Sequence, residues 1–224
     1  MTFSLAARDP GTGCFGMVIS SSSPAVAARC VNLRAGVGAV ASQNISNPAL
    51  GPLGLDLLSE GCTPDEVVSR LYEADRHIEY RQLMVLGTEG SSAVFEGMHT
   101  LGTHGFAQAS GVVAAGNLLA QPDVPRAMLD GYRESRGTEF EERLLHGFAA
   151  AVKAGGEAGR VRSAGLAVVD FRSWRLTDLR VDDADDPLEE LRRLVDLWLP
   201  QRDDYSLRAT EPNEAPAYGV PGDE

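Results

Sequence analysis

Strand-like segments occur in neighbouring pairs along this chain, and helical segments separate the pairs. Residues 2–7, TFSLAA, place Phe3 and Leu5 on one face and Thr2 and Ser4 on the other, which is the period of a half-buried strand. The turn RDPGTG then leads into a second strand-like run, CFGMVIS, which predicts a β-hairpin. Strands, helices, strands, helices, strands and a final helix follow one another. This order predicts one layered α+β domain, with two sheets between two layers of helices.

The boundaries of the other elements follow from the same patterns. Helix starts are predicted from capping residues, namely Thr63 with Glu66, Thr138 with Glu141, and Asp186 before Pro187. Strands are predicted within residues 35–43, 80–97, 111–117 and 161–182, and helices within 53–59, 63–75, 123–135, 138–154 and 186–199. We therefore expect a single domain over residues 1–200. Residues 201–224 are polar and proline-rich, and we expect them to form a flexible tail.

Charge and cysteine content limit the classes of partner and the cellular compartment. The formal net charge is −12 and the pI is near 4.8, so we expect no binding to nucleic acid or to an anionic membrane. No apolar run approaches the roughly 18 residues needed to span a bilayer, and no signal-peptide pattern precedes the first strand. The three cysteines lack the close pairing of a disulfide framework or a zinc site. Reduced thiols and a cytoplasmic location are therefore expected.

Thr2 directly follows Met1, and threonine is small enough for an aminopeptidase to remove the methionine before it. A free N-terminal threonine carries a hydroxyl nucleophile. On the same residue it carries an α-amine, with an unperturbed pKa of about 8, that can act as the base. No separate catalytic triad is then required. The alternative is that Thr2 is an ordinary strand residue, so the hypothesis depends on the rest of the sequence.

Seven segments in a fixed order resemble one protein family. They are TFSLAARDPGTGCFG, SSSPAVAARC, AGVGAVASQNISNPALGPLGLDLL, HIEYRQLMV, AAGNLLAQPDVPRAM, GRVRSAGLAVVD and LRVDDADDPLEELRRL. From Thr2 to about Leu199 the chain is similar to the DUF1028 family of Ntn-hydrolase-like proteins. The resemblance implies a four-layer αββα sandwich and a superfamily whose members cleave amide bonds. It also implies a nucleophile at the mature N-terminus, a position that only Thr2 matches.

Four polar residues near predicted strand ends are candidates to assist Thr2. Acyl transfer needs hydrogen-bond donors where the oxyanion develops, and Asn117, after an apolar strand and a glycine, is the leading candidate. The alternative for Asn117 is to cap the following turn. Ser21 matches a recurrent serine of the family, although a serine run before proline also suits a loop. Gln43 and Asn44 could bind a substrate amide, orient the terminal amine, or cap a turn.

Arginine is the candidate cation near Thr2. Proteasome-like relatives place a lysine beside the threonine, whereas the single lysine here, Lys153, lies late in a predicted helix. Arg29 and Arg160, together with Arg8, are the candidate substitutes. A guanidinium does not exchange a proton, so they could act only electrostatically, and surface ion pairs are the alternative use. The four histidines are scattered, which gives no pattern for a metal site. No cofactor is expected.

The expected function is therefore hydrolysis of a C–N amide bond in a small metabolite, with cyclic amides and ureides as candidate substrates. Thr2 would supply the nucleophile and Asn117 would help to hold the oxyanion. The alternative is a non-catalytic protein that binds a small molecule or forms assemblies on the same scaffold. Paired sheets with short exposed strands leave a homodimer or a higher homo-oligomer open.

Overall fold

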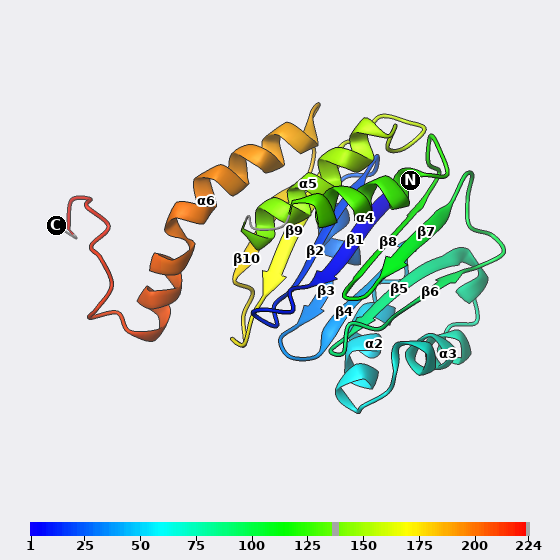
Figure 1. The fold of residues 1–224 in the computed structure, drawn as a ribbon, viewed down its shortest axis with the longest axis horizontal. Coiled ribbons are helices and arrows are strands. Elements are labelled where there is room, and N and C mark those ends of the chain that lie inside the picture. Colours follow the sequence, from blue (N-terminus) through cyan, green and yellow to red (C-terminus); the bar gives the residue numbers. More distant parts are fainter. Residues whose placement is uncertain (136–138, 223–224) are drawn as a thin grey trace.

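Two antiparallel sheets form the centre of the protein (Figure 1). A computed structural model describes residues 1–135 and 139–222. The six-stranded sheet has the order β10 (Thr177–Val181), β9 (Ser163–Val169), β2 (Phe15–Ser21), β1 (Thr2–Arg8), β8 (Val112–Asn117) and β7 (Gly105–Ala109). The four-stranded sheet has the order β3 (Asn32–Arg34), β4 (Gly38–Asn44), β5 (Arg81–Gly87) and β6 (Ser92–Glu96). The helices are α1 (Val26–Cys30), α2 (Leu50–Ser59), α3 (Pro64–Ala74), α4 (Val124–Glu134), α5 (Phe140–Lys153) and α6 (Pro187–Thr210), with a 3₁₀ turn at Ile78–Tyr80.

Three apolar clusters hold the helices and sheets together. One joins the six-stranded sheet to α4, α5 and α6, and it includes Phe3 and Phe148. Figure 1 shows α4 and α5 lying over this sheet. A second lies between the two sheets and includes Met17 from one sheet and Met84 from the other. The third joins the four-stranded sheet to α2 and α3, around Leu71. The result is a mixed α/β fold with two antiparallel sheets. None of the helices in the described part of the chain is long and apolar enough to cross a membrane.

The predicted N-terminal hairpin is confirmed. β1 and β2 pair in antiparallel register, from Thr2 opposite Ser21 to Arg8 opposite Phe15. Residues of β1 alternate as predicted, because Phe3 belongs to the cluster that faces the helices while other residues of the strand face the second sheet. β1 is a central strand with β2 on one side and β8 on the other, so its first residue has a neighbouring strand on each side.

The sequence patterns do not predict three of the shortest elements. We did not predict β3, α1 or β7, which contain only three to five residues each. Such segments are shorter than the window in which a helical or strand period can be recognised. The strand expected over residues 35–43 begins only at Gly38, because Gly36 adopts a positive φ of 66° in the turn between β3 and β4.

The predicted start of α5 is wrong by one residue. Its capping box is formed by Glu139 and Glu142, rather than by Thr138 and Glu141. Thr138 itself lies outside the described residues. Glu141 is buried and accepts a hydrogen bond from Thr177 at 2.6 Å, so its carboxylate is used in a tertiary contact. A local spacing rule cannot distinguish a capping carboxylate from one that points into the core.

The last helix continues beyond the residue at which we expected the polar tail to begin. α6 runs through Pro200 to Thr210, whereas we predicted its end at residue 199. A proline removes one intrahelical hydrogen bond, but contacts on the far side of Pro200 hold the next turns in place. Arg202 pairs with the buried Glu141 at 3.1 Å, and Ser206 is buried. Tertiary contacts therefore outweigh the local signal to end the helix.

The pairing of α4 with α5 gives a stability prediction. A Cβ added to Gly131 would lie 2.4 Å from the Cβ of Ala150 and 3.1 Å from the carbonyl oxygen of His146. We expect Gly131→Ala to lower the free energy of unfolding by about 1–3 kcal/mol, because the two helices must separate. Alanine is favoured over glycine by about 1 kcal/mol inside a helix, which opposes the loss only in part. Urea unfolding measures the difference, and equal or higher stability of the variant would contradict it.

Candidate active site

Four polar residues form a row across one end of the six-stranded sheet. Asn117 of β8 lies opposite Thr2 of β1, Thr2 lies opposite Ser21 of β2, and Ser21 lies opposite Ser163 of β9. Residues opposite one another in an antiparallel pair point to the same face. All four side chains are buried, and the row faces the space between the sheets, where Ala6 also packs. The sheet therefore places two predicted site residues, Ser21 and Asn117, on either side of a third, Thr2.

The Thr2 hydroxyl lies at the centre of this row. The residue is 5% exposed, and its Oγ1 donates a hydrogen bond of 2.5 Å to the Met1 carbonyl oxygen. Ser21 Oγ lies 3.4 Å from Thr2 Oγ1 and donates to the same Met1 carbonyl. Ser23 Oγ lies 2.9 Å from Ser21 Oγ. Two hydroxyl groups thus hold the carbonyl of the Met1–Thr2 peptide bond.

A network of buried amide side chains lies behind Thr2. Ser4 Oγ donates to Gln43 Oε1 at 2.8 Å, and Gln43 Nε2 donates to Gln82 Oε1 at 2.9 Å. Asn117 Nδ2 donates to the same Gln82 oxygen at 3.0 Å. Gln82 Nε2 donates to the carbonyl of Gly116 at 2.9 Å, which fixes the orientation of the Gln82 amide. Gln43 therefore supports the site from behind, and Gln82 connects it to Asn117.

One acceptor in this network has no partner. Asn117 Oδ1 is buried and makes no hydrogen bond to any residue that the structure describes. Among the described residues, one of the two Nδ2 hydrogens of Asn117 has a partner, in the bond to Gln82. A buried polar atom without a partner is costly, which makes this amide a candidate to bind a ligand or a terminal amine.

Glu157 is a site residue that the sequence analysis missed. It follows the glycine pair after α5, it is 5% exposed, and its Oε2 accepts a hydrogen bond of 3.1 Å from the Ser22 amide. Burial raises the pKa of Glu157 to about 7, while the nearby N-terminal ammonium and the Ser22 amide act in the opposite direction. A single glutamate in a glycine-rich loop gives no periodic signal. Gln82 was also missed, although one glutamine within the apolar run RQLMVL is a recognisable sign of a buried polar group.

Three other candidates make different contacts. Asn44, in a left-handed conformation with φ 70°, donates to the Tyr80 carbonyl at 2.7 Å and accepts from the Leu101 amide at 3.3 Å. It therefore positions neighbouring loops. Arg29 Nη1 donates to the carbonyl of Pro24 at 2.7 Å, within its own loop and helix. Arg160 is exposed and pairs with Asp185 at 2.9 Å. The structure brings none of these three side chains into hydrogen-bond contact with Thr2.

The raised pKa of Glu157 predicts a pH-dependent stability. The pKa of the Glu157 carboxyl group is higher in the folded than in the unfolded protein. Its contribution to the free energy of unfolding is therefore fully present below about pH 4.5 and is lost as the pH rises through about 7. We compare the free energy of unfolding of Glu157→Gln with that of the wild type. The difference in favour of the variant should be larger at pH 8 than at pH 4.5 by on the order of 3 kcal/mol. Urea unfolding at both values measures this. The control Glu89→Gln changes an exposed glutamate and should show the same pH dependence of stability as the wild type. A parallel profile for Glu157→Gln would contradict the prediction.

Comparison with known proteins identifies a family. The family model described as "Family of unknown function (DUF1028)" matches residues 2–191. The crystal structure of a Silicibacter pomeroyi protein of the same family is similar, with a TM-score of 0.84, 28% identity, and coverage of 91% of this chain and 89% of that chain. Anbu, the ancestral β-subunit from Yersinia bercovieri, is less similar, with a TM-score of 0.39, 11% identity, and coverage of 88% of this chain and 97% of that chain. A search of curated proteins found no match.

The matched residues include both strands of the N-terminal hairpin, the strand that ends in Asn117 and the loop that carries Glu157. The related crystal structure agrees over nearly the whole chain. This chain therefore belongs to the DUF1028 family, a family of unknown function.

Proposed function

We propose that this protein is an N-terminal-nucleophile hydrolase, in which removal of Met1 exposes Thr2. The proposed reaction is cleavage of a C–N amide bond in a small metabolite, with cyclic amides and ureides as the first class to test. We propose, with it, that the two sheets and their helices form the four-layer αββα sandwich of that superfamily. The observation that carries the proposal is the position of Thr2, whose hydroxyl lies at the first residue of a central strand between Ser21 and Asn117.

Met1 occupies the space that a substrate would need. Its carbonyl takes the hydrogen bonds of Thr2 and Ser21, and a Cβ at Gly159 would lie 2.8 Å from its Cε. While Met1 is attached, the Thr2 nitrogen is an amide and cannot act as a base. Its removal would free the hydroxyl, produce the α-amine and vacate the space beside Gly159 that the Met1 side chain fills.

The proposed chemistry uses groups already close to Thr2. Thr2 Oγ1 attacks the substrate carbonyl, and the α-amine takes the hydroxyl proton and passes it to the departing nitrogen as the C–N bond breaks. The second Nδ2 hydrogen of Asn117 would donate to the oxyanion, and its unpartnered Oδ1 would accept from the Thr2 amine. Water then attacks the ester, which releases the carboxylate and restores the hydroxyl.

A second candidate function is a non-catalytic protein that binds a small molecule or forms assemblies. The observation that favours it is the Met1 carbonyl, which the hydroxyls of Thr2 and Ser21 hold in place. If Met1 stays attached, this carbonyl fills the position of a substrate carbonyl and the site has no free amine.

Intact-mass measurement separates the two functions. The protein is produced without an N-terminal tag, weighed, and weighed again after treatment with an acylating probe that mimics an activated amide. Loss of Met1 and a single adduct that peptide mapping places on Thr2 would support the hydrolase. Retention of Met1 without a Thr2 adduct would reject it in favour of the non-catalytic protein. Adducts on Cys14, Cys30 or Cys62 are distinguished by the same mapping.

A further inference from the structure

A cavity lies at the opposite end of β1 from Thr2. Its volume is about 490 Å³, and the turn after β1, the turn between β7 and β8, and helices α4 and α5 surround it. The polar residues that line it are Arg8, Asp9, Ser110, Tyr132, Arg133 and Arg143. Thr2 and Arg8 are the two ends of β1, which places them about 20 Å apart along the strand. The cavity is thus separate from the proposed active site.

Positive charge is concentrated in this cavity, although the whole chain has a formal net charge of −12. Three arginines and a single carboxylate, that of Asp9, contribute to its wall. Asp9 Oδ1 already accepts a hydrogen bond of 2.9 Å from the Gly11 amide. Its Oδ2 lies 3.9 Å from Arg143 Nη1, at the outer limit of an ion pair. One carboxylate cannot neutralise three guanidinium groups.

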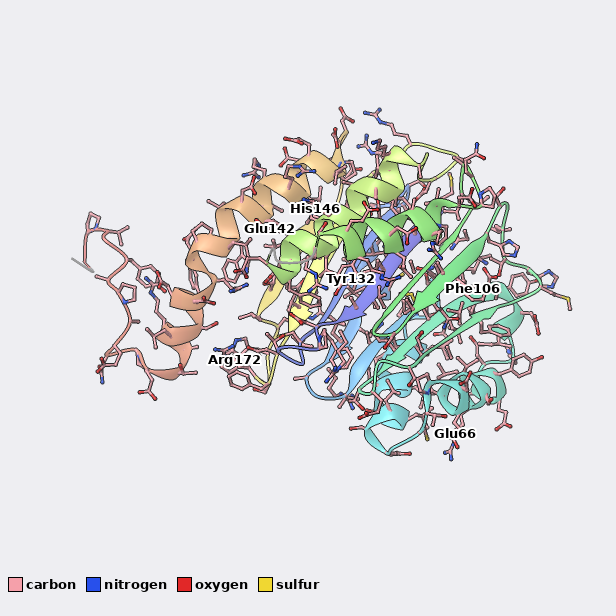
Figure 2. The ribbon with its side chains drawn as sticks, in the orientation of Figure 1. Glu66, Phe106, Tyr132, Glu142, His146 and Arg172 are labelled. Atoms are coloured by element: carbon pink, nitrogen blue, oxygen red, sulfur yellow. The ribbon has the colours of Figure 1, made fainter. Side chains whose placement is uncertain are left out.

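Arg143 is held in a fixed position at the wall of the cavity. Its Nη2 donates to Tyr132 Oη at 2.8 Å, and its guanidinium lies 4.5 Å from the centre of the Tyr132 ring. Tyr132 is buried between α4 and the six-stranded sheet (Figure 2). Arg143 Nε is buried and has no hydrogen-bond partner among the described residues. A guanidinium held this way is ready to receive an acceptor without losing much side-chain freedom.

Arg8 and Arg133 supply the remaining charge from two different elements. Arg8 ends β1 and Arg133 lies in the last turn of α4. Neither side chain forms an ion pair with a carboxylate of residues 1–135 or 139–222. Most other arginines that the structure describes are paired, such as Arg126 with Asp130 on the same helix α4. Arg8 and Arg133 thus bring two guanidinium groups without an ion pair to the wall of one cavity.

We propose that this cavity binds a small anion through a carboxylate or phosphate group. Guanidinium groups form strong, charge-assisted hydrogen bonds to both kinds of oxygen, and several can share one anionic group. The hydroxyl groups of Ser110 and Tyr132 offer further hydrogen bonds at the wall. This inference is independent of the proposed hydrolase, because none of the residues that bind the anion contacts Thr2.

Isothermal titration with inorganic phosphate and with succinate tests the proposal. We expect saturable binding of at least one of the two, and the preferred probe identifies the anionic group. Arg8→Gln and Arg133→Gln should each weaken binding by about tenfold or more, because each removes a charged hydrogen bond. Arg126→Gln is the matched control on α4 and should leave binding unchanged. Circular dichroism of each variant verifies that it is folded.

Two outcomes would overturn the proposal. One is the absence of saturable binding for both probes. The other is binding that Arg8→Gln and Arg133→Gln leave intact, or that Arg126→Gln weakens equally, which would indicate a general charge effect. The titration is repeated in Thr2→Ala protein, where binding should be unchanged. Anion binding is thereby tested separately from the hydrolase activity proposed for Thr2.

Discussion

Thr2→Ala is expected to reduce amide hydrolysis by roughly a thousandfold or more, because it removes the atom that forms the acyl-enzyme bond. Alanine is also small enough to allow removal of Met1, so the variant keeps the free amine. The fold should tolerate the change, since within the described part of the chain the lost hydroxyl bonds to just Met1 and Ser21. We expect a loss of about 1 kcal/mol in stability, which corresponds to a fall of about 2–4 °C in Tm. Steady-state kinetics and thermal unfolding measure the two effects.

The matched control is Thr2→Ser, which retains a hydroxyl and an N-terminal amine. We expect it to keep measurable turnover and to accept the acylating probe at residue 2. Full activity in Thr2→Ala would refute the assignment of the nucleophile. Equal loss of activity in both variants, with Met1 removed from each, would show that loss of the hydroxyl does not explain the inactivity of Thr2→Ala.

Gln82→Leu is expected to destabilise the protein by about 4 kcal/mol. Gln82 is fully buried, and its amide accepts from Gln43 and Asn117 and donates to Gly116 and Glu96. Leucine has a similar volume, so the change removes hydrogen bonds while filling most of the space. Each buried partner left without a bond costs about 1–3 kcal/mol. Urea unfolding measures the loss, and hydrolysis should fall as well because Asn117 is no longer held.

Gln108→Leu is the matched control for this variant. Gln108 is exposed on the edge strand β7, the strand that carries Phe106, and its amide donates to Ser92. Exposed substitutions of this kind usually change stability by less than about 1 kcal/mol. If Gln82→Leu costs no more than Gln108→Leu, the buried amides do not stabilise the fold.

Much of the local structure follows from the sequence. The alternation of Phe3 and Leu5 with Thr2 and Ser4 predicted β1, and the capping box of Thr63 and Glu66 predicted the start of α3. Both signals lie within a few residues and depend on local geometry, the alternation of side chains along a strand and the hydrogen bonds of one helix turn. The same kind of signal failed at α5, where Glu141 is used by Thr177 on a distant strand.

The site was only partly predictable, for a related reason. Thr2 was found because its position after Met1 is visible in the sequence, and Asn117 because it ends an apolar strand. Glu157 is more than 150 residues from Thr2 in sequence, and it meets the N-terminus only because the loop after α5 returns to this end of the sheet. A contact between residues so far apart produces no periodic pattern in the sequence.

The sequence by itself determined the alternation of strand pairs with helices, the N-terminal hairpin, the family, and the identity of Thr2 as the candidate nucleophile. Tertiary structure alone decided which polar side chains surround it. Strand register placed Asn117 and Ser21 beside Thr2, and the packing of one sheet on the other placed Gln43 and Gln82 behind it. Backbone propensities act over a few residues, whereas register and sheet packing depend on contacts between residues far apart in the chain.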